Sequence, residues 1–234
     1  HYTETMSEHS NTPETPAIQP RHVFSSLPKY AAGKPPTPVE GLKQYKLSSN
    51  ENPHGPIPEV ARILAEFDAT HRYPDPLSTK LRTALAHRLG VDAHNIVTGA
   101  GSLGALNQIL KAFAGASLDG TQDEVIYAWR SFEAYPILVG LLGAKSVQIP
   151  NLPNGAHDLN AMAQAVTDRT RVILVCTPNN PTGPAVTEAQ MREFLAKIPE
   201  NVVVVIDEAY YEFCTASTVP AGQNAPVNGL NLLN

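Results

Sequence analysis

The sequence is poor in cysteine and has no long apolar segment. Of its 234 residues only Cys176 and Cys214 are cysteines, and neither stands in a C-x-x-C or Cys/His metal spacing. We therefore expect no disulfide framework and a reduced, cytoplasmic setting. No apolar run approaches the roughly 20 residues that cross a bilayer, and no signal-peptide pattern opens the chain, so we expect no membrane partner.

Charge of one sign is not concentrated anywhere along the chain. Lys and Arg total 17 against 22 Asp and Glu, which gives a net charge of −5, and the eight histidines are scattered without ligand spacing. A basic surface for nucleic acid and a metal site are therefore not expected. With 42% hydrophobic residues the chain has enough apolar material for a globular core. A small-molecule ligand is the better expectation.

Proline divides the chain into an irregular first part and a regular second part. Ten of the 21 prolines fall within the first 58 residues, mixed with Ser, Thr and Glu. We predict that residues 1–46 form an N-terminal tag remnant, up to the residue before Met6, and a flexible arm. Residues 215–234 contain no charged side chain and no helix or strand period, so we predict an irregular tail there.

Between these ends the pattern alternates between short apolar runs and amphipathic segments. The predicted helices are residues 59–67, 77–90, 102–113, 132–142, 158–166 and 187–198, and the predicted strands are 95–99, 123–128, 145–150, 171–176 and 202–206. Thr187 and Gln190 form a capping box at the start of the last helix. Continuous apolar strands separated by helices of about ten residues predict an α/β fold, a mostly parallel sheet with helices on both faces.

Two polar motifs follow buried strands of this predicted sheet. TPNNPTG, residues 177–183, comes after RVILVC, and DEAYYEF, residues 207–213, comes after NVVVVI. Open α/β sheets bind ligands at the carboxyl ends of their strands, which is where both motifs lie. Taken singly, the first is only an Asn-Pro-Gly turn and Asp207 only a cap of the next segment.

Further candidate segments are individually weaker. GAGSLG, residues 99–104, lies between a predicted strand and a helix, where backbone N–H groups can face an anion, but it matches no strict G-x-G-x-x-G pattern. AWRSFEAYP offers three aromatic residues that could stack on a ligand or simply pack in the core. RYPDP and SSNENPHGP read as turns on their own.

Together, the motifs from about residue 47 to 213 resemble those of the fold type I pyridoxal-phosphate aminotransferases, most closely their histidinol-phosphate and aromatic amino acid (phenylalanine) branch. The resemblance implies that residues 47–214 are part of the large cofactor-binding α/β domain and that the cofactor is pyridoxal 5'-phosphate. It also implies a homodimer, over which the later part of the N-terminal arm would lie.

The resemblance also assigns roles to individual residues. It implies that Asp207 faces the pyridine nitrogen of the cofactor and keeps the ring protonated, so that the ring can accept electrons. Asn180 and Tyr210 are implied to contact the phenolic oxygen of the cofactor. Phe132 is implied to stack on its ring, a role for which Trp129 and Tyr135 compete. The implied phosphate contacts are Gly101, Ser102 and Leu103, with Tyr73 reaching the cofactor phosphate of a neighbouring subunit. Asn52 is implied to lie near the substrate.

The Schiff-base lysine of the family has no counterpart in these 234 residues. All eight lysines precede Asp207, and none matches the family's lysine motif. The substrate-binding arginine of the family's smaller domain is not found either. We therefore expect a chain truncated before that lysine, without the small domain and with weak or no turnover by itself.

The resulting hypothesis is an aminotransferase of aromatic amino acids, phenylalanine type, with a 2-oxo acid such as 2-oxoglutarate as acceptor. Histidinol-phosphate aminotransferase, as in histidine biosynthesis, is the alternative that the motifs do not separate from it. A non-catalytic truncated fragment that keeps a partial cofactor site is the alternative from another class. A general nucleotide binder that uses residues 99–104 would leave TPNNPTG and DEAYYEF unexplained.

Overall fold

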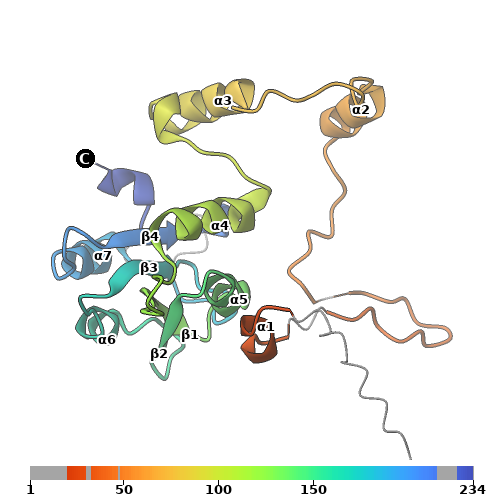
Figure 1. Cartoon of the computed structure of the whole chain (residues 1–234). Coiled ribbons are helices and arrows are strands. Elements are labelled where there is room, and N and C mark those ends of the chain that lie inside the picture. The colour runs from red at the N-terminus through yellow and green to blue at the C-terminus, as the bar shows by residue number, and fades with distance from the viewer. Residues whose placement is uncertain (1–19, 30–32, 47, 215–225, 234) are drawn as a thin grey trace, which may run out of the picture.

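A computed structural model of the chain describes residues 20–29, 33–46, 48–214 and 226–233 (Figure 1). Its centre is a four-stranded sheet in the order β2-β1-β3-β4, and every neighbouring pair is parallel. The strands are β1 (Glu124–Trp129), β2 (Lys145–Pro150), β3 (Thr170–Cys176) and β4 (Val203–Asp207). The predicted parallel α/β sheet is confirmed.

Helices cover both faces of the sheet, as predicted. α4 (Gly101–Phe113) and α5 (Ala134–Leu141) cover one face, and α6 (Leu159–Gln164) and α7 (Glu188–Leu195) cover the other (Figure 1). Successive strand residues point to opposite faces, so Val172 and Leu174 pack with α4 and α5 while Ile173 and Val175 pack with α6 and α7. Two apolar cores therefore hold one continuous sheet.

Local sequence signals account for the ends of several helices. α7 begins at the predicted capping box, in which the Thr187 hydroxyl accepts from the Gln190 N–H and the Gln190 side chain accepts from the Thr187 N–H. α3 (Thr79–Leu89) ends at Gly90, whose φ of +70° is the left-handed conformation that favours glycine at this position. Both boundaries agree with the sequence prediction to within two residues.

One predicted strand is wrong. Residues 95–99 are not in the sheet: Asn95 closes a short 3-10 helix, η1 (Ala93–Asn95), and the segment continues without strand structure to α4. A strand needs a neighbouring strand for its backbone groups, whereas here the Thr98 carbonyl accepts from the Gln108 side chain of α4. The apolar run alone could not reveal that missing neighbour.

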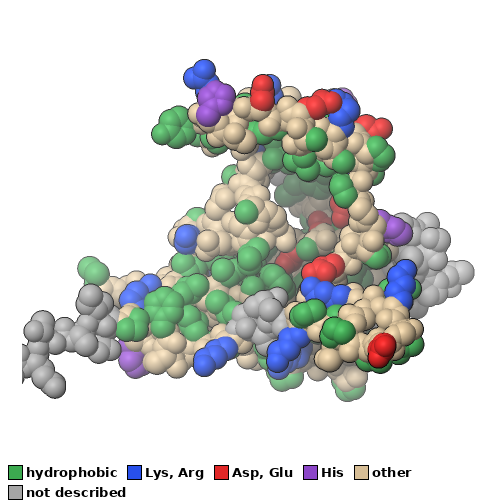
Figure 2. Space-filling view, turned by 90° about the vertical axis from the view of Figure 1, so that its right-hand side faces the viewer, with side chains coloured by type: hydrophobic (Ala, Val, Ile, Leu, Met, Phe, Trp, Pro, Cys, Tyr) green, Lys and Arg blue, Asp and Glu red, His purple; other side chains and the backbone are tan. Residues whose placement is uncertain are grey.

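Two of the first three helices lie apart from the sheet layers. α1 (Val23–Ser26), in the predicted arm, packs against α5, whereas α2 (Pro58–Glu66) and α3 bury no residue (Figure 1). Figure 2 shows a hollow between this outlying part and the body, with hydrophobic side chains exposed on both. The helix periods predicted for α2 and α3 are confirmed, but their apolar faces have no cover within the described residues.

Part of the C-terminal segment is packed, contrary to the expectation of an irregular tail. Val227 is fully buried among the residues of α6 and α7, and the Val227 N–H donates to the Val186 carbonyl. A last 3-10 helix, η3 (Gly229–Leu232), follows. An isolated valine carries no helix or strand period, so the sequence pattern missed this contact.

Among the described residues no helix is long and apolar enough to cross a membrane.

Candidate active site

The two polar motifs meet at the carboxyl edge of the sheet. Cys176 ends β3 and is the register partner of Asp207, which ends β4, so the segments that follow them leave the sheet side by side. The Thr177 N–H donates to the Asp207 carbonyl over 2.9 Å, which extends the pairing by one residue. The predicted position of both motifs, at neighbouring strand ends, is confirmed.

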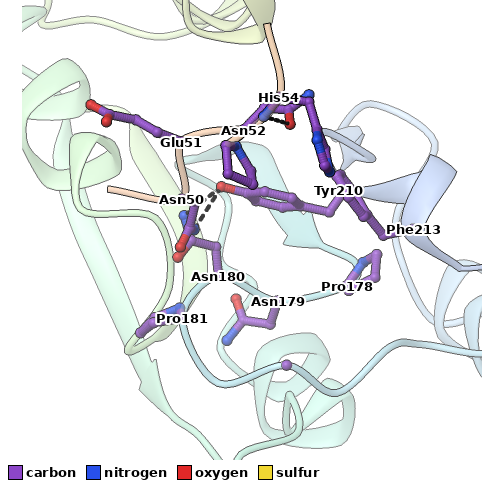
Figure 3. A pocket seen from close by; sticks show the side chains of 12 residues that line it. Asn50, Glu51, Asn52, His54, Pro178, Asn179, Asn180, Pro181, Tyr210 and Phe213 are labelled. Atoms are coloured by element: carbon purple, nitrogen blue, oxygen red, sulfur yellow. Dashed lines mark hydrogen bonds between the residues drawn. The ribbon is translucent and has the colours of Figure 1, made fainter. Parts of the chain in front are cut away.

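Two adjoining cavities lie where these segments meet the loop around residue 50, and Figure 3 shows the side chains that line the larger one. The larger has a volume of about 610 Å³ and the smaller about 330 Å³, both within the range usual for small-molecule sites. Four residues line both of them: Asn50, Asn180, Pro181 and Tyr210. The two cavities are therefore parts of one site, divided by these side chains.

The larger cavity is apolar over most of its wall and the smaller one is mixed. Pro53, His54, Pro178 and Phe213 contribute to the larger, together with Asn52. The smaller is lined among others by Gly33, Ser131, Phe132 and Glu133. Among the described residues that line either cavity there is no Lys or Arg.

The hydroxyl of Tyr210 is the point at which the polar groups converge. Asn50 donates its side-chain amide to this oxygen over 3.0 Å and Asn180 does so over 3.3 Å (Figure 3). A phenolic hydroxyl has one hydrogen and two acceptor positions, so two incoming donors leave its hydrogen for a third partner. Because Tyr210 lines both cavities, that hydrogen is available to a ligand acceptor there.

A hydrogen-bond network centred on the buried Asn179 holds the loop that carries Asn180. The buried Asn179 accepts from the Ser131 hydroxyl over 2.7 Å and donates to the Arg130 carbonyl and the Thr182 hydroxyl. Thr182 in turn donates to the Gly155 carbonyl over 2.7 Å. Buried polar groups with all their partners in place fix the conformation of a loop, so Asn180 is presented from a rigid support.

Asp207 is half-buried and turned toward α5. Its Oδ2 accepts a 2.7 Å hydrogen bond from the Tyr135 hydroxyl, and its Oδ1 accepts from the Ala209 N–H over 3.2 Å. Asp207 is not among the residues that line the two cavities. Burial raises the pKa of the Tyr135 hydroxyl far above its ordinary value, and the neighbouring Cys176 and Asp207 raise it further, so Tyr135 is the donor in this pair.

The structure brings together four of the predicted site residues: Asn52, Phe132, Asn180 and Tyr210 all line one or both cavities. Gly101, Ser102 and Leu103 form the first turn of α4 and are exposed, and they line neither cavity. Tyr73 is fully exposed, with a relative accessibility of 103%, and lies in the outlying part of the chain between α2 and α3.

Sequence reasoning missed several residues that organise the site. Tyr135 was considered only as a stacking partner, yet it is fully buried and binds Asp207. Asn179 precedes the predicted Asn180 and anchors the loop through its hydrogen bonds with Ser131 and Arg130. Asn50 stands with Asn52 in SSNENPHGP, which the family resemblance implies to lie near the substrate, but its contact with Tyr210 across 160 positions of sequence follows from no local pattern. Only the three-dimensional path of the segment around residue 50 places it beside Tyr210.

Comparison with known proteins identifies the family of the chain. The family model described as "Aminotransferase class I and II" matches residues 43–230. The chain belongs to this family. An aromatic amino acid aminotransferase of Streptomyces coelicolor is 48% identical over 203 residues, covering 86% of the chain and 55% of the relative. One of Cutibacterium acnes is 45% identical over 217 residues, covering 91% and 56%. The chain thus spans about half the length of these curated relatives.

Solved structures give the same fold assignment. The histidinol-phosphate aminotransferase of Sinorhizobium meliloti in complex with pyridoxal-5'-phosphate superposes with a TM-score of 0.64 at 27% identity, over 74% of this chain and 46% of that one. A mutant aspartate aminotransferase of Thermus thermophilus gives 0.54 at 26% identity, over 62% and 41%. The predicted fold, the large domain of fold type I aminotransferases, is confirmed in the part that the chain spans.

Proposed function

We propose that the protein is a pyridoxal-phosphate-dependent aminotransferase that moves an amino group between an aromatic amino acid and a 2-oxo acid such as 2-oxoglutarate. The observation that carries this proposal is the meeting of Asn180 and Tyr210 between a mixed and an apolar cavity at the sheet's carboxyl edge. The relatives at 45–48% identity, each described as an aromatic amino acid aminotransferase, support the same activity.

The donor set suits pyridoxal phosphate. Its phenolic oxygen calls for hydrogen-bond donors, and the Tyr210 hydroxyl keeps its hydrogen free for such an acceptor because Asn50 and Asn180 both donate to it. Asp207 supplies a carboxylate for the pyridine nitrogen, and Phe132 supplies an aromatic face. Gly101, at φ +66°, begins α4, whose first N–H groups suit a phosphate. When bound, the cofactor supplies a ring that withdraws electrons from the substrate's α-carbon.

The protein's own residues then bind and orient. Asn180 and Tyr210 would fix the ring on its oxygen side, and Asn179 holds their loop in place through its buried bonds. Asn52, whose Oδ1 accepts the His54 N–H, would lie at the substrate entrance (Figure 3). The lysine that the family uses to form the covalent link and to move the proton is not among these 234 residues, so no residue of this chain is assigned that step.

The larger cavity favours an aromatic substrate over histidinol phosphate. Most of its wall area is apolar, and Pro53, Pro178 and Phe213 suit the burial of an aromatic ring, while four asparagines and Glu51 supply polar groups beside them. With the cofactor's phosphate assigned to the N-terminus of α4, the second phosphate monoester of histidinol phosphate would call for Arg or Lys, and neither lines either cavity within the described part of the chain. The likeness to histidinol-phosphate aminotransferases supports the fold more than the substrate.

We also infer that the protein forms a homodimer. α2 exposes Val60, Ile63 and Leu64 on one side, and Tyr73 after it is fully exposed. Contiguous exposed apolar surface marks an interaction site. A second copy of the chain, with Tyr73 directed to the neighbouring subunit's cofactor phosphate, accounts for both features.

The proposal is tested on the native protein, purified from the cells that produce it. Glutamate formation from 2-oxoglutarate is measured with phenylalanine, tyrosine or histidinol phosphate as amino donor, and we expect kcat/KM to be highest for the aromatic donors. Tyr210→Phe removes the hydroxyl that receives Asn50 and Asn180, so kcat/KM should fall by about tenfold, the scale of one hydrogen bond at a charged centre. Tyr211→Phe, one residue on, is the control and should keep the activity.

Each outcome has a separate meaning. A higher kcat/KM for histidinol phosphate would replace the substrate assignment and leave the cofactor assignment standing. Failure of the 234-residue chain to bind pyridoxal phosphate in an absorbance titration would refute the cofactor assignment for this chain and favour the non-catalytic fragment.

A further inference from the structure

Tyr135 joins two layers of the fold at the candidate active site. It stands in the first turn of α5, on the face of the sheet covered by α4 and α5, and its side chain is fully buried. Its hydroxyl reaches the end of β4 and donates to Asp207 Oδ2 over 2.7 Å. The contact spans 72 positions of sequence and passes the end of β3, which lies between β1 and β4.

The ring of Tyr135 is held on two sides by other aromatic rings. Tyr127 packs against it edge to face with centroids 5.6 Å apart and planes at 67°, and Phe132 does so at 5.6 Å and 87°. Phe132 also lines the smaller cavity. Such contacts and complete burial hold the ring in place, so the position of its hydroxyl oxygen beside the end of β4 is set by the core and not by a ligand.

We propose that Tyr135 is a positioning residue of the active site, which orients the Asp207 carboxylate for a protonated ring nitrogen of the bound cofactor. The inference rests on the proposed function, because it assumes that Asp207 meets that nitrogen. Tyr135 itself lines neither cavity and acts through Asp207.

The Asp207 carboxylate has hydrogen-bond capacity left for a ligand. A carboxylate has about four acceptor positions, two on each oxygen. Tyr135 takes one on Oδ2 and the Ala209 N–H takes one on Oδ1, so the plane of the carboxylate is fixed while one position on each oxygen is left. A charged acceptor held in one orientation binds a cationic N–H without the cost of ordering it first.

The test compares two ligands and two hydroxyl deletions in the 234-residue chain. Pyridoxal phosphate and its analogue with carbon in place of the ring nitrogen are titrated by absorbance or fluorescence. Tyr135→Phe keeps the ring between Tyr127 and Phe132 but removes the donor. We expect it to weaken pyridoxal phosphate about tenfold, the scale of a charge-assisted hydrogen bond, and to leave the carbon analogue within about twofold.

Tyr127→Phe is the matched control. Tyr127 is equally buried and belongs to the same aromatic cluster, but its hydroxyl accepts from Gln148 and does not contact Asp207. Removing the Tyr127 hydroxyl should leave the affinities for pyridoxal phosphate and for the carbon analogue unchanged. In the Asp207→Asn background, Tyr135→Phe should have no further effect on pyridoxal phosphate, because the carboxylate through which it acts is gone.

The results separate this inference from the proposed function. Binding of pyridoxal phosphate that is equal in the unaltered chain and Tyr135→Phe overturns the role of Tyr135 and leaves the proposed function intact. An equal loss for both ligands, or unfolding of Tyr135→Phe but not Tyr127→Phe in circular dichroism, assigns the hydroxyl to the core and also overturns it. If the unaltered chain binds neither ligand, the proposed cofactor and this inference fail together.

Discussion

At the scale of single residues, Gly155 supports the loop that carries Asn180. Its φ of +81° lies in the left-handed region, and an added Cβ would stand 3.0 Å from Thr182 Cβ. Thr182 donates to the Gly155 carbonyl and accepts from Asn179, so a shift of Thr182 disturbs the loop from which Asn180 projects. We expect Gly155→Ala to destabilise the fold by more than the roughly 1 kcal/mol of left-handed strain alone. It should also weaken pyridoxal phosphate binding.

Gly120 provides the control for that substitution. Its φ is +85°, but nothing lies within 4 Å of the position that a Cβ would take, and it precedes the opposite end of β1. Gly120→Ala should therefore show the strain without the loss of ligand affinity. Thermal unfolding and ligand titration of both variants separate the two effects. Equal ligand affinity in the two variants would show that the contact with Thr182 does not govern the loop.

At the scale of elements, the packed C-terminal segment is tied to the sheet edge through Glu208. Its Oε1 accepts the Gly229 N–H over 2.9 Å, and the carboxyl is half-buried. Burial raises the pKa of Glu208 above its ordinary value, and the charges of Glu212 and Asp207 raise it further, against the hydrogen bond from Gly229. The folded state therefore binds this proton more tightly than the unfolded state does.

The sign of the pH dependence follows from that raised pKa. As pH rises from the ordinary pKa of a glutamate to the raised one, the folded state holds more protons than the unfolded state, so stability falls over that window and then stays level. Glu208→Gln keeps an acceptor for Gly229 and removes the titration. It should increase stability at pH 7 by no more than about 1 kcal/mol, since the side chain is half exposed to screening solvent.

Denaturant unfolding between the acid range and pH 7 checks this expectation. Glu200→Gln, at an exposed position, is the control and should leave the pH profile unchanged. A Glu208→Gln variant that is less stable than the unaltered chain at pH 7 would mean that the ionised carboxylate strengthens the bond to Gly229 by more than its burial costs.

The elements of the sheet and its helices could be predicted because their signals are local. β3 and β4 are continuous apolar runs, and α7 carries its capping box in Thr187 and Gln190. Residues 95–99 have the same apolar character as a strand, but strand structure depends on a neighbour that the sequence cannot display. Val227 is buried by α6 and α7, a contact without any period in its own segment.

At the scale of the whole molecule, the candidate site was predictable only where motifs carried it. Asn180, Tyr210 and Asp207 stand in motifs at strand ends, and two of them line the cavities. Asn50 and Tyr135 reach them from segments 160 and 72 positions away, and their roles depend on how the layers stack. Long-range contacts of this kind follow from the assembled fold, so sequence reasoning predicted Asn180 and Tyr210 at the cavities but not the contacts that support the site.

The whole-molecule prediction concerns the exposed apolar side of α2. Val60, Ile63, Leu64 and Phe67 recur at helical spacing and are all exposed, while the other side carries Arg62, which pairs with Glu66. If a second copy covers the apolar side, replacing Ile63 and Leu64 together by Asp should convert the dimer to a monomer, because two charges would be buried without partners. Sedimentation equilibrium measures the dissociation constant, which we expect to rise by at least about a hundredfold.

Arg62→Asp is the matched control for that double variant. Like the double variant, it changes the net charge by −2 and introduces an aspartate on α2. The aspartate stands, however, on the side of the helix that bears the ion pair with Glu66. Its dimer dissociation constant should stay within a few-fold of the unaltered value, since exposed ion pairs contribute little. Dissociation of both variants to the same extent would assign the effect to charge or to loss of the helix. A chain that is monomeric at tens of micromolar before any substitution would refute the dimer, and the apolar side of α2 would then require a cover other than a second copy.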